Sequence, residues 1–74
     1  MMSTVEVCIH NRDQVKFLEW VTIPEFGLEL LLERVMGLKE DEREKFVKHL
    51  KSMTVMSCIS EDGEYTLVAT NFRQ

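Results

Sequence analysis

The spacing of apolar residues changes twice along this chain, and these changes limit the folds that it can adopt. Apolar and polar residues alternate near both ends of the sequence, whereas residues 24–53 carry apolar residues three and four apart. Alternation is typical of a strand, and spacing of three and four is typical of an amphipathic helix. The order therefore predicts an α+β fold of the type ββααββ, a helical hairpin between two β-hairpins. We expect its 74 residues to form a single domain over residues 1–74.

The first β-hairpin is expected to contain strands at residues 4–11 and 14–22. A three-residue turn at residues 11–13 would place the apolar residues of both strands on one face, and it would pair Val7 with Phe17. The opposite face of the second strand would then carry Leu18 and Trp20, so neither face of this hairpin is wholly polar.

Both helices have end signals in the sequence. Thr22 lies three residues before Glu25, which is a capping-box pattern for the start of the first helix, and Gly37 is a typical C-terminal stop. The second helix is expected over residues 40–53, because acidic residues occupy its first turn and basic residues its last turns. Its narrow apolar stripe predicts one buried side and consists of Phe46, Val47, Leu50 and Met53.

The last β-hairpin has a strong turn signal at Asp62 and Gly63. A turn there predicts that alternate residues of the two flanking strands share one face. These residues are Met56, Cys58, Tyr65, Leu67 and Ala69.

The first helix carries more apolar residues than one buried side requires. One stripe is wide enough to cover a sheet and contains Leu28, Leu31, Leu32, Val35 and Met36. Phe26 and Leu30 lie four apart on the opposite side, with charged residues beside them. They could pack against the second helix, form a dimer interface or bind another protein. Leu18 and Trp20 are similarly either anchors of a protein interface or covered by the second hairpin.

The sequence contains no convincing catalytic or metal-binding pattern. Cys8 and Cys58 are expected to be free thiols, and the histidines and cysteines lack the spacing of structural zinc sites. Cys8 and His10 are the only candidate for a nucleophile with a base, but two residues along a strand is a marginal distance, so we expect a surface thiol. We therefore predict no enzyme, no metal and no cofactor.

The charge pattern restricts the class of partner. A net charge of −4 with scattered basic residues argues against general nucleic-acid binding. No apolar run reaches the length of a membrane span, and the absence of a signal peptide predicts a cytoplasmic protein. Acidic residues form two clusters, which are Glu40, Asp41, Glu42 and Glu44, and then Glu61, Asp62 and Glu64.

These observations predict a small, non-enzymatic regulatory protein that binds another protein and works as a homodimer. The candidate protein-binding residues are Leu18, Trp20, Phe26 and Leu30. One alternative is an acidic inhibitor of a nucleic-acid-processing enzyme, whose carboxylate clusters would occupy the place of phosphates. A less favoured alternative is a helix-turn-helix DNA-binding regulator, because the acidic start of the second helix would face phosphates.

Overall fold

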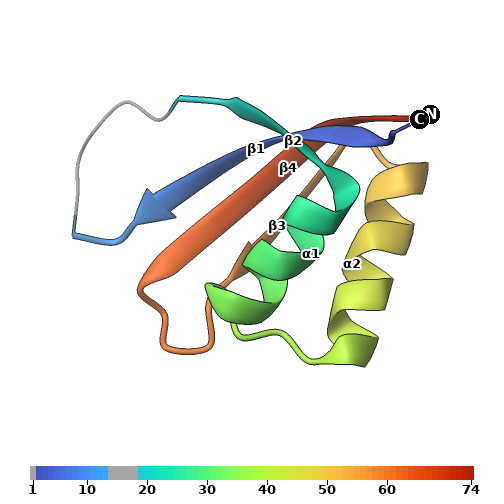
Figure 1. Cartoon of the computed structure of the whole chain (residues 1–74). Helices are drawn as coiled ribbons and strands as arrows, with labels where there is room; N and C mark the ends of the chain where they lie inside the picture. Colours follow the sequence, from blue (N-terminus) through green and yellow to red (C-terminus); the bar gives the residue numbers. More distant parts are fainter. Residues whose placement is uncertain (1, 14–18) are drawn as a thin grey trace.

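The computed structural model describes residues 2–13 and 19–74 and contains one four-stranded antiparallel sheet with two helices on one of its faces (Figure 1). The strand order is β2-β1-β4-β3, so both hairpins belong to a single sheet. This arrangement confirms the predicted α+β fold and the ββααββ order. The elements are β1 (Thr4–Asn11), β2 (Val21–Pro24), α1 (Glu25–Arg34), α2 (Glu40–Ser52), β3 (Val55–Ile59) and β4 (Tyr65–Arg73).

The centre of the sheet is the antiparallel pair β1 and β4, which come from opposite ends of the chain. The register shifts between Thr4 and Glu6, opposite Asn71, whose backbone has a positive φ of 51°. Asparagine tolerates this conformation better than most residues. The Asn71 side-chain amide also donates a 2.7 Å hydrogen bond to the Glu6 carboxylate. This hydrogen bond therefore connects the two central strands at the bulge.

The core lies between the sheet and the helices. Helix α1 packs on β1 and β2, and α2 packs on β3 and β4. Since each helix covers one hairpin, the helical pair spans the sheet from one edge strand to the other (Figure 1). The buried apolar residues of this layer are Val5, Val7, Leu28, Leu32, Met36, Phe46, Val47, Leu50, Leu67 and Ala69.

The β3–β4 hairpin has the predicted register, with Cys58 opposite Leu67 and Met56 opposite Ala69. Its turn is held by buried Ser60, whose hydroxyl donates a 2.6 Å hydrogen bond to the Asp62 carboxylate. The same hydroxyl accepts a 2.9 Å bond from the backbone N–H of Tyr65. Turn chemistry and the apolar pattern therefore agree at this hairpin.

The predicted register of the first hairpin is wrong. Val7 pairs with Val21, and Val5 pairs with Ile23, so the partner strand begins much later than expected. This register differs from the one that a three-residue turn would give. The core sets it instead, because this pairing puts Ile23 against the buried cluster. The predicted pairing partner, Phe17, lies outside the described residues.

The predicted capping box of α1 is also wrong. Thr22 lies within β2, and Pro24 occupies the position before the helix without a side-chain capping bond. The backbone N–H of Glu25 instead donates a 3.0 Å bond to the carbonyl of Ser3. The strand continues into the helix without a loop, so the sheet itself fixes where α1 begins.

The predicted end of α1 and start of α2 are confirmed. Gly37 follows α1 with a positive φ of 72°, which glycine adopts without steric cost. Helix α2 begins at Glu40, and the Glu42 carboxylate accepts a 3.1 Å hydrogen bond from the backbone N–H of Lys39. Three residues of its predicted stripe are buried, but Met53 lies beyond the helix and is 58% exposed.

Candidate protein-binding surface

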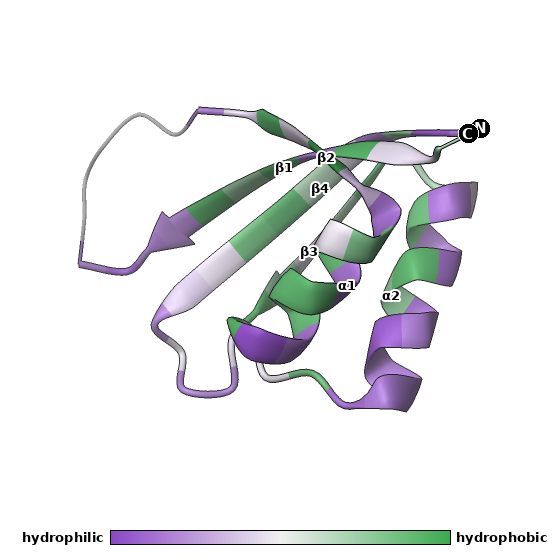
Figure 2. Ribbon diagram, viewed as in Figure 1, coloured by the Kyte–Doolittle hydropathy of each residue, from purple (hydrophilic) through white to green (hydrophobic). Residues whose placement is uncertain are grey.

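Helix α1 is apolar on two opposite sides, and only one of them is covered. Leu28, Leu32 and Met36 are 0% exposed beneath the helix. Phe26 and Leu30 remain 62% and 44% exposed, because α2 does not cover them. In this chain, packing against the second helix is therefore not their role. Figure 2 shows the contrast between the largely apolar α1 and the mostly hydrophilic outer surface of α2.

An open groove of about 420 Å³ runs between the two helices beside this exposed pair. We call it the helix groove. It is lined by Phe26, Glu29, Leu30, Glu33, Glu40, Arg43 and Glu44. A second hollow shares Glu29 and Glu44 and continues toward Val47 and Lys48. The groove therefore follows much of the length of the helical hairpin.

The walls of the helix groove are held at both ends by ion pairs between the helices. Arg43 on α2 lies 3.5 Å from Glu33 on α1, and Lys51 lies 3.0 Å from Glu25. The Lys51 ammonium also lies 5.3 Å from the centre of the Phe72 ring. In both ion pairs α2 supplies the cation and α1 the carboxylate, so the two helices are connected on either side of the exposed apolar pair.

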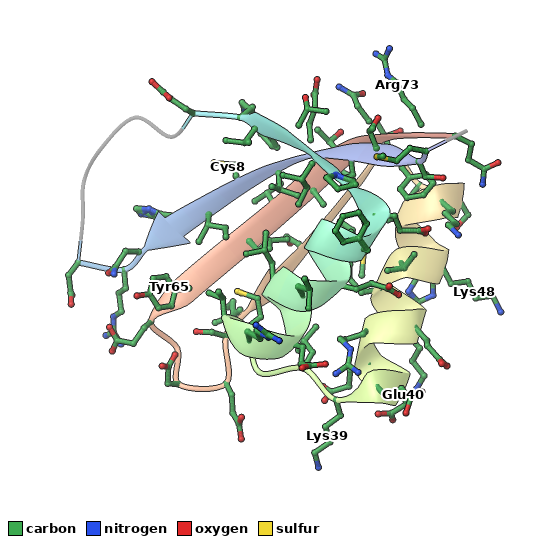
Figure 3. The ribbon with its side chains drawn as sticks, in the orientation of Figure 1. Cys8, Lys39, Glu40, Lys48, Tyr65 and Arg73 are labelled. Atoms are coloured by element: carbon green, nitrogen blue, oxygen red, sulfur yellow. The ribbon has the colours of Figure 1, made fainter. Side chains whose placement is uncertain are left out.

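The helix groove is acidic. Four glutamates line it against one arginine, and that arginine is already used. Arg43 faces Glu33 and donates a 2.7 Å hydrogen bond to the carbonyl of Leu38. Among the described residues, Glu29, Glu40 and Glu44 have no ion-pair partner within 4 Å. Figure 3 shows Glu40 on the first turn of α2.

Of the other two candidate binding residues, Trp20 is described by the structure. Trp20 is 51% exposed immediately before β2. Leu18 lies outside the described residues. Trp20 is thus an exposed aromatic side chain next to the edge strand β2, and it does not line the helix groove.

The edge strand β3 is a further candidate surface that the sequence reasoning did not select. Val55 and Ile59 are 50% and 65% exposed on the face of the sheet away from the helices. No charged residue occurs between Met53 and Ser60. The other edge, β2, has four residues and ends at Pro24. The sequence did contain a signal for this surface, because the predicted strand carries apolar residues on both of its faces.

The two acidic clusters come to the same end of the molecule. The backbone N–H of Glu61 donates a 3.0 Å bond to the carbonyl of Met36, in the connection that leads into α2. Two of the carboxylates serve local structure, since Glu42 accepts a bond at the start of α2 and Asp62 accepts bonds within its turn. Glu40 and Glu44 belong to the helix groove as well.

The geometry around Cys8 corrects the expectation of a surface thiol. Cys8 is only 4% exposed, and burial raises the pKa of its thiol. Burial also raises the pKa of the Cys58 thiol to about 11. A raised pKa lowers the thiolate fraction, which is the opposite of the change in an activated nucleophile. Cys8 and Cys58 lie on opposite faces of the sheet, and both are free.

His10 lies on the same face of the sheet as Cys8, and its buried Nδ1 atom has no hydrogen-bond partner among the described residues. No three His, Cys, Asp or Glu residues within the described ranges are arranged to hold a metal ion. The described helices are also too short and too polar to cross a membrane.

The chain matches no family model, no curated protein and no solved structure to a significant degree. Its function must therefore be inferred from its own surfaces.

Proposed function

We propose that this is a non-enzymatic regulatory protein that acts by binding another protein, and that the helix groove is the binding surface. The observation that supports the proposal most strongly is the exposure of Phe26 and Leu30. Two large apolar side chains on consecutive turns, with charged residues around them, have the composition of an interface core and rim. Since Leu28 and Leu32 on the other side of the helix are fully buried in the core, the exposed pair is not needed to hold the fold together.

We propose further that the protein works as a homodimer and that β3 is the subunit contact. An edge strand with exposed apolar residues and no charge or proline lacks the usual protection against strand pairing. The net charge of −4 would oppose association at most other surfaces, whereas two copies of β3 bring no like charges together. Antiparallel pairing of this strand with its copy would give a closed twofold interface.

The test of partner binding is affinity capture from cells that express the protein, followed by mass spectrometry. The wild type is compared with Phe26→Ser/Leu30→Ser, which removes the apolar pair and adds no charge. We expect one or more proteins to be retained by the wild type and lost with the variant. Retention of the same proteins by both forms would show that the helix groove is not the binding surface.

The test of self-association is molar mass by light scattering over about a hundredfold range of concentration. We expect a wild-type dimer, a monomer for Val55→Lys/Ile59→Lys, and a dimer for Phe26→Glu/Leu30→Glu. A wild-type protein that stays monomeric throughout this range would refute the homodimer. A dimer split only by the Phe26/Leu30 substitutions would move the subunit contact from β3 to the helix groove.

An acidic inhibitor of a nucleic-acid-processing enzyme is the second candidate. It is favoured by one observation, the meeting of both carboxylate clusters at one end of the molecule. Such an inhibitor would act on a basic groove and would weaken with salt. Inhibition of a nuclease or polymerase that disappears when Glu40, Asp41, Glu61 and Glu64 are neutralised would support it. Inhibition that survives this neutralisation would count against it. Failure to inhibit any of the enzymes tested would also count against it.

A further inference from the structure

We infer that the occupant of the helix groove is a cationic amphipathic helix of a partner protein, with apolar residues on one side and Lys or Arg on its flanks. The inference rests on the proposed function, because it names the class of partner for the same groove. It follows from the charges around Phe26 and Leu30, from their spacing, and from the shape of the surface between two helices.

The charges of the helix groove have a cost that a cation would remove. Glu29 and Glu33 lie four apart on α1, and Glu40 and Glu44 lie four apart on α2. Like charges at this spacing destabilise a helix. Among the described residues, Glu33 is the one of these four that has a cationic partner within 4 Å, which is Arg43 at 3.5 Å. Glu40 favours the start of α2 from its first turn, but it has no ion-pair partner among the described residues, and neither do Glu29 and Glu44. Together these three carboxylates would attract a positively charged ligand.

The carboxylates surround the apolar pair instead of forming a separate patch. Glu29 and Glu33 follow Phe26 and Leu30 on the same side of α1, and Glu40 and Glu44 face them from α2. A ligand that buries its own apolar residues against this pair must therefore bring its flanking residues next to glutamates. Charge complementarity requires those flanks to be Lys or Arg.

The geometry fits a helix as the ligand. Phe26 and Leu30 are spaced by one turn, so they match apolar residues three or four apart on a third helix. Helix α1 has ten residues, which at about 1.5 Å per residue gives a groove wall of about 15 Å. A partner helix of about ten residues would span this wall and pack on the helical pair on its side away from the sheet.

The test uses a fluorescently labelled model peptide of Leu and Lys, with Leu at the spacing of one helix face and Lys elsewhere. Its binding to the full chain is measured by fluorescence anisotropy at about 50 mM and about 500 mM salt. Two control peptides are matched to it. One replaces every Lys by Glu, and the other has the same composition in an order without an apolar face.

Two variants separate the apolar and the electrostatic parts of the site. Phe26→Ser/Leu30→Ser removes the apolar pair and is matched by Val21→Ser/Met53→Ser, which removes two side chains of similar exposure elsewhere. The triple variant Glu29→Gln/Glu40→Gln/Glu44→Gln removes the unpaired carboxylates. Its control removes three charges away from the helix groove and is Glu19→Gln/Glu61→Gln/Glu64→Gln. Circular dichroism checks that each variant is folded.

We expect the Lys peptide to bind the wild type at least tenfold more tightly than either control peptide. The triple Gln variant should weaken binding by about tenfold at low salt, since three exposed ion pairs contribute about twofold each. The high-salt medium should reduce this difference. The Phe26/Leu30 variant should weaken binding at both salt concentrations, whereas the two control variants should bind like the wild type.

Three results would overturn the inference, and they differ in what they say about the proposed function. In the first, Phe26→Ser/Leu30→Ser abolishes protein capture, but the triple Gln variant binds like the wild type and the Glu peptide binds like the Lys peptide. The groove then binds protein, and its charge does not matter. If Phe26→Ser/Leu30→Ser changes neither capture nor peptide binding, the inference and the proposed surface both fail. If these substitutions split a wild-type dimer and the Lys peptide does not bind, the occupant is a second copy of the chain.

Discussion

Both sides of α1 carry large apolar residues, but their environments are opposite. Leu28 and Leu32 are fully buried against the sheet, while Leu30, between them in sequence, is 44% exposed beside a groove lined by carboxylates. Hydrophobicity alone therefore does not reveal which side of the helix stabilises the fold. What separates the sides is position, because the sheet can cover only one of them. The apolar residues that this helix carries beyond the needs of the core, Phe26 and Leu30, therefore lie on the surface of the protein.

The largest expected effect comes from the covered side. Leu32→Ala should lower the free energy of unfolding by about 2–5 kcal/mol, because it removes buried methyl groups and leaves a cavity. Urea unfolding followed by circular dichroism measures the change. A loss below about 1 kcal/mol would show that this side of α1 is less tightly packed than its exposure indicates, and it would weaken the contrast between the two sides.

A smaller effect is expected at the end of α1. Gly37→Ala should cost about 1–2 kcal/mol, because φ is 72° there and a Cβ would lie 3.0 Å from the Glu61 carboxylate. Gly27→Ala is the matched control within the same helix. Its Cβ would have no neighbour closer than 3.6 Å, so we expect a gain of about 0.5–1 kcal/mol. Thermal unfolding of both variants tests the pair, and equal effects would contradict the special role of Gly37.

A pH-dependent effect is expected in the turn between β3 and β4. The Ser60 hydroxyl bond and the Glu64 backbone bond hold the pKa of Asp62 below its ordinary value. The ionised carboxylate therefore stabilises the fold above the unfolded-state pKa of about 4, and this contribution is lost as the pH falls through the lower folded-state pKa. The stability difference between the wild type and Asp62→Asn should shrink as the pH is lowered from about 6 to about 2.

Ser60→Ala provides a second check on the same turn. Without the hydroxyl, the pKa of Asp62 should rise toward its ordinary value, so stability should depend less on pH in this range. Urea unfolding at several pH values measures both variants. An unchanged pH dependence in Ser60→Ala would show that the bond between Ser60 and Asp62 does not control this carboxylate.

The smallest effect on stability is expected on the uncovered side of α1. Leu30→Ala and Phe26→Ala should each change the free energy of unfolding by less than about 1 kcal/mol, since both residues are already largely in water. Leu32→Ala measured under the same conditions is the direct comparison. A loss for Leu30→Ala as large as that for Leu32→Ala would make the uncovered side part of the core after all.

The parts of the fold that the sequence predicted were those set by local patterns. The β3–β4 register follows from the two-residue turn at Asp62 and Gly63, and α2 begins at Glu40, where acidic residues favour a helix start. Both patterns act over a few residues, so no distant contact competes with them. Gly37 is similar, because only its own backbone conformation is involved.

The predictions that failed depended on contacts between distant residues. The pairing of Val7 and the role of Thr22 were assigned from a short turn and a local capping pattern. In the structure the core position of Ile23 and the direct passage from β2 into α1 decide both. Burial of Cys8 on the face of the sheet away from the helices was not predictable either, because it depends on how the strands are ordered in the sheet.

The candidate surface was partly predictable. Helical spacing alone separated Phe26 and Leu30 from the buried stripe, but it could not say whether α2 would cover them. The acidic lining requires knowledge of how the two helices lie together, since Glu29 and Glu44 come from different helices. The exposed edge at β3 requires the strand order in the same way.

The central pairing of β1 with β4 has a consequence for synthesis of the protein. Loop-closure entropy opposes contacts between residues far apart in sequence, and such contacts slow folding. Here the middle of the sheet joins Val7 to Ala69 and His10 to Thr66, so most of the chain must be made before its central strands can meet. On the ribosome, the emerging chain would expose the apolar sides of β1 and α1 until residues 65–73 leave the exit tunnel. The sheet should therefore form only after residues 65–73 have emerged, and during this interval the chain would depend on whatever binds exposed apolar segments of nascent proteins.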